Sequence, residues 1–194
     1  MARQIEQSRF PTPRSASMRQ KKIINILIVI GASGLLLVLW FNGFAYLYAQ
    51  MLKLGANILL LFSSDTHVGL KLVENAPTFI VDTIIDGKKG SYPQKADLIL
   101  LPFIMILTWQ ILLFFNLPLK QATRSAIENI LIFYAIQLIY VLFLTSYYNS
   151  PIIKFIYDLL LDSFYIIALF LIVKDSFKYE LIGLARRVGK ASDA

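Results

Sequence analysis

The stretch Leu98–Asn116 reads LILLPFIMILTWQILLFFN and contains no charged residue. About 20 apolar residues let a helix cross the hydrocarbon core of a bilayer, and this stretch is of that length. Three further blocks are long and largely apolar: Ile23–Phe41, Ser125–Tyr148 and Ile152–Val173. The sequence therefore predicts an all-α integral membrane bundle of four transmembrane helices.

The composition of the whole chain agrees with a membrane protein. Of its 194 residues, 57% are hydrophobic and 16% are charged, whereas about 25% of the residues in a soluble domain are charged. We expect one membrane domain over residues 23–173, between a flexible basic tail (1–22) and a polar tail (174–194). The first apolar block is longer than the core of a secretory signal, so we expect it to be retained.

The basic residues predict the orientation of the chain. The formal net charge is +7, and most basic residues flank the apolar blocks, which favours contact with anionic lipid headgroups rather than with nucleic acid. With four spans, about two thirds of the lysine and arginine residues lie on the side of the two tails. The positive-inside rule then predicts a multi-pass protein of the cell (inner) membrane, with cytoplasmic N- and C-termini.

The segment Gly43–Phe62 is apolar enough to span the membrane a further time, but it contains Lys53. Only Asn42 separates it from the first block, which is a very short turn between antiparallel spans. A fifth span would also weaken the charge bias between the two sides. We therefore expect this segment to form an interfacial helix that lies on or dips into the outer surface.

The polar loop 63–97 contains two runs with the character of strands. Val68–Val73 and Thr78–Asp86 are rich in β-branched and apolar residues. Asn75-Ala76-Pro77 between them and the glycine-rich stretch 87–90 after them are turn signals. We expect a small extracytoplasmic β segment, either a hairpin or a pair of short strands on the membrane surface.

The fourth apolar block carries the candidate polar site. Lys154, Asp158, Asp162 and Tyr165 recur at helical spacing and form one stripe. Two neighbouring carboxyl groups in a low dielectric do not both ionise readily, so one could hold a proton in an ion path. Gln137, in the middle of the third block, is a further candidate.

A structural role for the same residues remains open at this point. Asp158 at headgroup depth could pair with Lys154, and Asp162 could hydrogen-bond a neighbouring helix. Near the start of the third block, Ser125 and Glu128 have the spacing of a capping box, a structural feature of helix N-termini.

The remaining chemistry-bearing residues are few. The chain has no cysteine and one histidine, His67, which excludes thiol chemistry and makes a histidine-based metal site implausible. No phosphate-binding loop, nucleophile elbow or metalloprotease motif is present. We expect no cofactor and no metal.

The order of parts resembles the exosortase and archaeosortase family of membrane transpeptidase-like enzymes. The resemblance lies in a first span, the interfacial segment Tyr46–Asn57 (YLYAQMLKLGAN), a short outer β segment and further spans that follow Asn116–Lys120 (NLPLK). It implies a cysteine nucleophile supported by arginine and histidine. This chain has no cysteine, and around Lys95–Leu101 it offers no substitute nucleophile beyond Asp97, so no catalytic residue carries over.

Three functions are compatible with these features. The first is a non-enzymatic membrane component whose outer loop contacts a protein partner or a second copy in an envelope or secretion-type assembly. The second is a small oligomeric proton- or ion-coupled transporter that uses Asp158 and Asp162. The third is a membrane enzyme with an exosortase-like scaffold that acts on a lipid-linked or peptide substrate.

Overall fold

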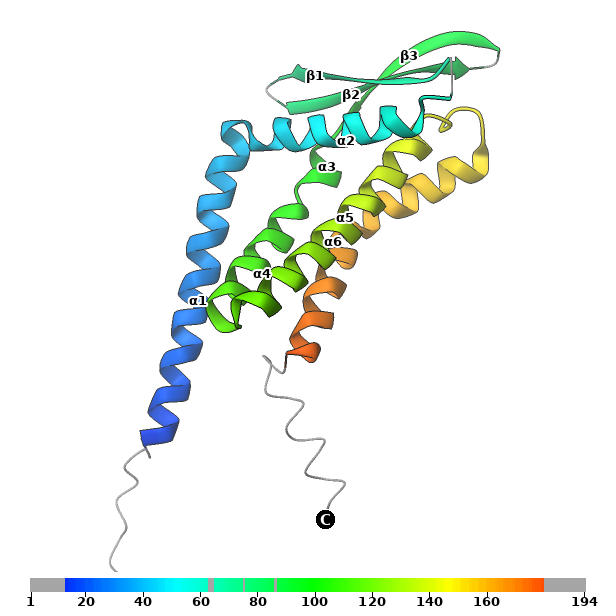
Figure 1. Cartoon of the computed structure of the whole chain (residues 1–194). Helices are drawn as coiled ribbons and strands as arrows, with labels where there is room; N and C mark the ends of the chain where they lie inside the picture. The colour runs from blue at the N-terminus through cyan, green and yellow to red at the C-terminus, as the bar shows by residue number, and fades with distance from the viewer. Residues whose placement is uncertain (1–12, 63–64, 75, 86, 180–194) are drawn as a thin grey trace, which may run out of the picture.

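The computed structural model describes residues 13–62, 65–74, 76–85 and 87–179. Within them, four helical segments are long and apolar enough to cross a membrane: Ile23–Leu59, Asp97–Asn116, Leu119–Leu144 and Pro151–Lys178. They carry a small antiparallel sheet at one end (Figure 1). We call this the platform end and the opposite one the distal end. The predicted four apolar helices and small β segment are thus confirmed.

The first helical segment bends sharply before it reaches the sheet. Helix α1 (Pro13–Leu39) leads into a π-helical turn, η1 (Trp40–Phe44), and then into α2 (Ala45–Leu59). Gly43 has a φ of 109°, a backbone conformation that residues with a Cβ atom rarely adopt. The bend lays α2 across the platform end instead of along the other helices (Figure 1).

The start of α1 differs from the predicted flexible tail at 1–22. Residues 1–12 lie outside the described part, but the helix begins at Pro13. Proline suits the first position of a helix because its missing N–H would have no partner there. Pro13 therefore marks the start of the helix, and residues 13–22 of the predicted tail are helical.

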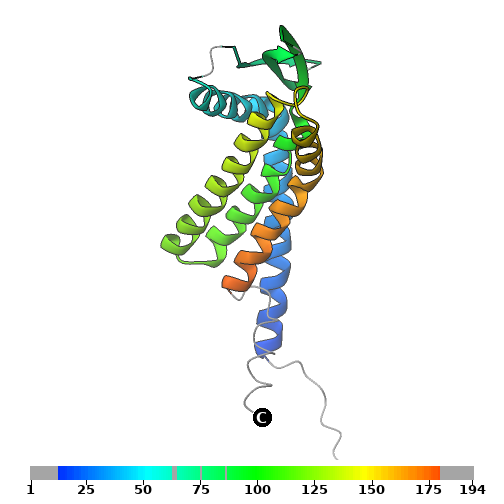
Figure 2. The same cartoon turned by 90° about the vertical axis from the view of Figure 1, so that its right-hand side faces the viewer.

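Three strands form the sheet in the order β1-β2-β3: β1 (His67–Val73), β2 (Ala76–Ile85) and β3 (Lys88–Lys95). Val68, Phe79 and Val81 are fully buried. In β2, Phe79, Val81 and Thr83 are buried at every second position, and Val68 lies opposite Val81, so these side chains share the buried face of the sheet, toward α2. The sheet thus covers the side of α2 that faces away from the helices (Figure 2).

Strand β3 was not predicted, because its lysines, Gly90 and Pro93 have the composition of a turn. It forms because its whole length pairs with β2, from Lys88 with Ile85 to Lys95 with Thr78. The predicted turn at 75–77 is also partly wrong: Pro77 lies inside β2, opposite Leu72. Its carbonyl group accepts from Ala96 N at 3.0 Å, on the side of β2 that faces β3. The nitrogen of the same residue points to that side as well, so the missing N–H removes no hydrogen bond to β1.

The other helices form the bundle. The short α3 (Asp97–Leu100) and α4 (Phe103–Asn116) are separated at Pro102, whose ring cannot donate a backbone hydrogen bond. Helix α5 (Leu119–Leu144) begins at once after Pro118. Ser125 and Glu128 consequently lie inside the helix, so the predicted capping box is wrong.

The last helix, α6 (Pro151–Lys178), begins with Ser150 as its cap, whose Oγ accepts from Ile153 N at 3.4 Å. It continues beyond the predicted end at Val173 into the polar segment. Its buried residues recur on one face: Tyr157, Phe164, Ala168, Leu171 and Asp175. The buried face thus runs from apolar residues directly into a carboxylate.

Aromatic rings form the core from the platform end into the bundle. Tyr48 of α2 stacks on Phe103 of α4 with centroids 4.1 Å apart, and Phe133 of α5 follows at 6.1 Å. Phe164 of α6 lies 6.0 Å from Phe133. Offset or edge-on aromatic pairs are favourable beyond the area they bury. This continuous ring contact joins α2 to three helices of the bundle.

Candidate functional site

Asp158 and Asp162 lie on the outside of the bundle. Both side chains are exposed on α6, in a stretch where Phe155, Leu159 and Ile166 are exposed as well. No hydrogen bond or ion pair joins either carboxylate to another described residue. Neither residue lines the corner cavity at the bend between α1 and α2 or the groove between α1, α4 and α6. The structure therefore does not place the two acids along an internal path within one chain.

Lys154 and Tyr165, the other two residues of the predicted stripe, have different surroundings. The Lys154 ammonium lies 5.5 Å from the centroid of the Tyr147 ring, a cation–π contact. Tyr165 is 43% exposed and lines an apolar groove between α1, α4 and α6. These four residues share a helix, but they do not form one polar cluster.

Gln137 is fully buried and connects three elements at the platform end. Its Oε1 accepts from Tyr48 Oη of α2 at 2.5 Å. Its Nε2 donates to the carbonyl oxygen of Ile99 in α3. Both ends of the amide are thus occupied, and the residue holds α2 and α3 against α5.

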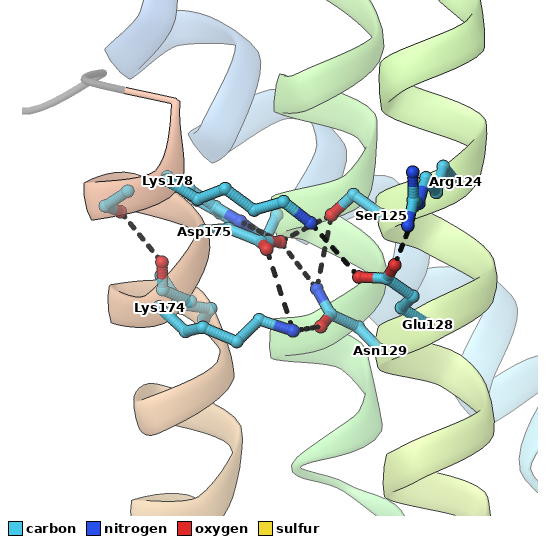
Figure 3. A network of polar contacts seen from close by, with 10 residues as sticks. Arg124, Ser125, Glu128, Asn129, Lys174, Asp175 and Lys178 are labelled. Atoms are coloured by element: carbon cyan, nitrogen blue, oxygen red, sulfur yellow. Dashed lines mark hydrogen bonds and ion pairs between the residues drawn. The ribbon is translucent and has the colours of Figure 1, made fainter.

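A buried carboxylate that the sequence did not reveal lies at the distal end. Asp175 is 0% exposed, and its Oδ2 accepts from Ser125 Oγ at 2.6 Å and from Asn129 Nδ2 at 2.6 Å. Trp109 Nε1 of α4 donates to the same oxygen at 3.3 Å. We call Trp109, Ser125, Asn129, Lys174 and Asp175 the Asp175 cluster. Figure 3 labels Ser125, Asn129, Lys174 and Asp175.

Lysine provides the opposite charge in this cluster. Lys174 Nζ donates to Asn129 Oδ1 at 2.8 Å and lies 3.9 Å from Asp175 Oδ1. A buried charge is costly unless it is paired and hydrogen-bonded, and here several donors and one ammonium share that role. The cluster therefore fastens α6 to α4 and α5 at the distal end.

A second charged group lies at the rim of the cluster. The Glu128 carboxylate is 3.1 Å from Arg124 Nε and 3.2 Å from Lys178 Nζ (Figure 3). These three side chains are partly exposed. They extend the contact between α5 and α6 to the surface, at the modest strength of exposed ion pairs.

The sequence contains a pattern that indicates the Asp175 cluster. Ser125, Asn129, Phe133 and Gln137 follow one another at intervals of four on α5, so three polar residues share the buried stripe of the helix. Asp175 continues the buried stripe of α6 in the same way. Polar residues at matching levels of two neighbouring stripes predict a contact between helices.

The platform, by which we mean α2 and the sheet, is fastened to the bundle along its length. Tyr134 Oη of α5 donates to Met51 O at 3.0 Å, and Tyr92 Oη of β3 donates to Leu144 O. Asn149 Nδ2 donates to Ile84 O, next to the start of α6. With the Gln137 contacts, these bonds give α2, β2 and β3 fixed positions over the helices.

A cavity of about 900 Å³ opens at the corner where α1 bends into α2. Most of its walls are apolar residues of η1 and the adjoining helices, and Leu72 and Pro77 of the sheet close one side. Glu74 and Asp97 contribute the two carboxylates among its lining residues. Asp97, the residue that the sequence offered in place of a nucleophile, therefore lies in this cavity together with Glu74.

No metal-binding group of three or more histidine, cysteine, aspartate and glutamate side chains occurs among the described residues. His67 lies exposed at the start of β1, opposite Asp82 of β2. Comparison of the chain with known protein families, with curated proteins and with solved structures finds no match. The site must therefore be interpreted from its own geometry.

Proposed function

We propose that the chain is a non-enzymatic integral membrane component that acts through its platform as a docking part of an envelope or secretion-type assembly. The observation that carries this proposal is the platform itself. It is fastened to the helices by hydrogen bonds from buried or half-buried side chains, while its far face is exposed. A surface held this firmly suits recognition of another protein.

Exposed apolar side chains support the placement in a membrane. Helix α1 exposes apolar residues from Ile23 to Leu39, and α2 exposes a stripe on the side opposite its buried face. The α2 stripe consists of Leu47, Met51, Leu54 and Ile58. Such surfaces are unfavourable in water and favourable against lipid acyl chains. In this proposal, α2 lies at the outer interface, the distal end faces the cytoplasm, and both tails are cytoplasmic.

The absence of cysteine allows a direct test of this orientation. Ser91→Cys places one thiol on β3, and Lys120→Cys places one at the start of α5, at opposite ends of the protein. In intact cells, a membrane-impermeant maleimide should label the first variant and not the second. Labelling of Lys120→Cys alone would reverse the orientation, and equal labelling of both would contradict membrane insertion.

Photo-crosslinking tests the docking role. A photoreactive phenylalanine analogue at exposed Lys71 or Ile84 of the sheet should give a discrete crosslinked product in cells. The same analogue at Phe170, exposed on α6, serves as a matched control on the surface that faces lipid. A platform without products, together with a monomer after extraction in native lipid, would contradict the proposal.

One observation favours a second candidate function. Asp158 and Asp162 are exposed beside apolar side chains, and a carboxylate that faces lipid at that depth is costly. A second copy packed against α6 would remove this cost and form a polar path between two chains, as in a small oligomeric transporter. If so, Asp162→Asn should abolish proton or ion flux into vesicles while the thermal unfolding midpoint stays unchanged.

A further inference from the structure

The free edge of β1 offers unpaired backbone groups. Val68 N–H donates to Asn57 Oδ1 at 2.9 Å, and Asn57 Nδ2 donates to Val68 O at 2.8 Å. In an antiparallel ladder, the N–H and C=O of one residue point to the same side. The backbone of Val68 therefore points away from β2, and the backbones of Leu70 and Leu72, two and four residues later, do the same.

The register of the sheet supports this assignment independently. Leu72 lies opposite Pro77, which has no N–H and whose carbonyl oxygen accepts from Ala96 N on the β3 side. The pair of Leu72 and Pro77 is thus one in which neither residue bonds the other. Asn57 closes the edge at Val68, but no described residue hydrogen-bonds to the outward groups of Leu70 or Leu72.

The open part of the edge borders the corner cavity. Leu72 lines the cavity of about 900 Å³ together with apolar residues of the bend between α1 and α2. These are Leu39, Trp40, Phe41, Phe44 and Leu47. An additional strand on β1 could direct alternate side chains into this apolar space, since neighbouring residues of a strand point to opposite faces.

The charges at the cavity favour a basic ligand. Glu74 and Asp97 both line it. The Lys95 ammonium is 3.5 Å from the Glu74 carboxylate, and its charge also acts on Asp97. Two carboxylates share one ammonium, so the wall retains a net negative charge. A lysine or arginine side chain of a ligand would neutralise this remaining negative charge.

We propose that an extended segment of a partner protein, with a lysine or arginine among apolar residues, binds in the corner cavity as an additional strand on β1. Main-chain hydrogen bonds to Leu70 and Leu72 give affinity, and the apolar walls with Glu74 and Asp97 select the sequence. This inference rests on the proposed docking function and specifies the chemistry of the partner.

Two substitutions at one position separate backbone pairing from side-chain contact. Leu72→Pro removes the outward N–H, which the sheet does not use, so the three strands stay paired. Leu72→Ala truncates the side chain and keeps the N–H. The probe is a synthetic peptide of alternating valine and lysine, compared with one of alternating valine and glutamate. Binding is measured by fluorescence anisotropy to the full chain in phosphatidylcholine nanodiscs.

The lysine peptide should bind the unchanged protein and Leu72→Ala. It should bind Leu72→Pro about tenfold more weakly, the size expected for a lost hydrogen bond. The glutamate peptide should bind weakly to all three proteins. Equal affinity for Leu72→Pro and the unchanged protein would overturn strand addition, and equal affinity for the two peptides would overturn the charge selection.

Hydrogen exchange gives a second measurement on the same samples. The amides of Leu70 and Leu72 should exchange rapidly in the free protein and become protected when the lysine peptide binds. Two other occupants would overturn the inference. A lipid chain would remain bound in Leu72→Pro and leave these amides unprotected, and a second copy would appear as a dimer that Leu72→Pro dissociates.

Failure of this inference can be distinguished from failure of the docking function. If Leu72→Pro leaves the crosslinks from Lys71 and Ile84 intact, the platform still docks a partner, but not through the edge of β1. If the crosslinks are absent from the unchanged protein as well, the docking function itself is wrong.

Discussion

Helix α6 carries acidic side chains in two regions, which the protein treats in opposite ways. Asp158 and Asp162, toward the platform end, are exposed on the outside of the bundle. Asp175, at the distal end, is fully buried and accepts hydrogen bonds from α4 and α5. An acid in an apolar helix is therefore not by itself a sign of an internal polar path. Whether an acid on such a helix is buried depends on whether the neighbouring helices provide hydrogen-bond donors for its carboxylate.

The largest effect is expected where the buried acid is removed. Asp175→Ala leaves Ser125, Asn129 and Trp109 without their common acceptor and Lys174 without its counter-charge. Breaking a buried pair costs about 3 to 5 kcal/mol. For a chain of this size, that lowers the midpoint of thermal unfolding in detergent by roughly 10 °C.

A milder variant keeps this prediction testable if Asp175→Ala does not fold. Asp175→Asn keeps the shape of the side chain and one acceptor but loses the charge. Its midpoint of thermal unfolding should therefore lie between those of the unchanged protein and Asp175→Ala. A midpoint equal to that of the unchanged protein for both variants would show that the Asp175 cluster does not hold the helices together.

The next effect concerns the platform end. Gln137→Leu leaves the Tyr48 hydroxyl group and the Ile99 carbonyl group buried without partners, which should cost about 2 kcal/mol. The double variant with Tyr48→Phe should lose less than the sum of the single variants, because the hydroxyl group that lost its partner is then absent. Additive losses in the unfolding midpoint would show that Tyr48 and Gln137 do not interact.

Tyr92→Phe tests the contact between β3 and α5 and should cost about 1 kcal/mol. Burial raises the pKa of the Tyr92 phenol above its ordinary value. The neutral phenol is thus favoured in the folded protein. The contribution of the Tyr92 phenol to the free energy of unfolding is fully present below about pH 10, the pKa of a tyrosine in the unfolded chain. It is lost as the pH rises further. Thermal unfolding followed from pH 8 to 11 should show a smaller alkaline loss for Tyr92→Phe than for the unchanged protein.

At the rim of the Asp175 cluster, a smaller effect is expected. Glu128→Gln breaks the exposed ion pairs with Arg124 and Lys178 and should cost no more than about 1 kcal/mol. Because these charges are screened by salt, the difference in unfolding midpoint should shrink between low and high ionic strength. A difference that persists in 1 M salt would show that Glu128 belongs energetically to the buried cluster.

The smallest effect on stability is expected at the exposed pair. Asp158→Asn and Asp162→Asn remove charges that no described residue pairs, so each should change stability by less than about 0.5 kcal/mol. If either substitution lowered the unfolding midpoint as much as Asp175→Asn, the two regions of α6 would not differ in the way the structure indicates.

The sequence by itself determined the four apolar helices and the crosswise position of α2. These follow from local properties, namely the length of each apolar block and the short, glycine-containing bend at Asn42 and Gly43. It also indicated β1 and β2, because the β-branched and apolar residues that favour a strand lie within each segment.

Only the tertiary structure decided β3, the two regions of α6 and the open edge of β1. Lys88–Lys95 becomes a strand because β2 provides a partner and Leu144 accepts from Tyr92. Asp175 becomes buried because Ser125 and Asn129, about fifty residues earlier in the chain, face it. These outcomes depend on which elements meet across long separations in sequence, and no local pattern of composition contains that information.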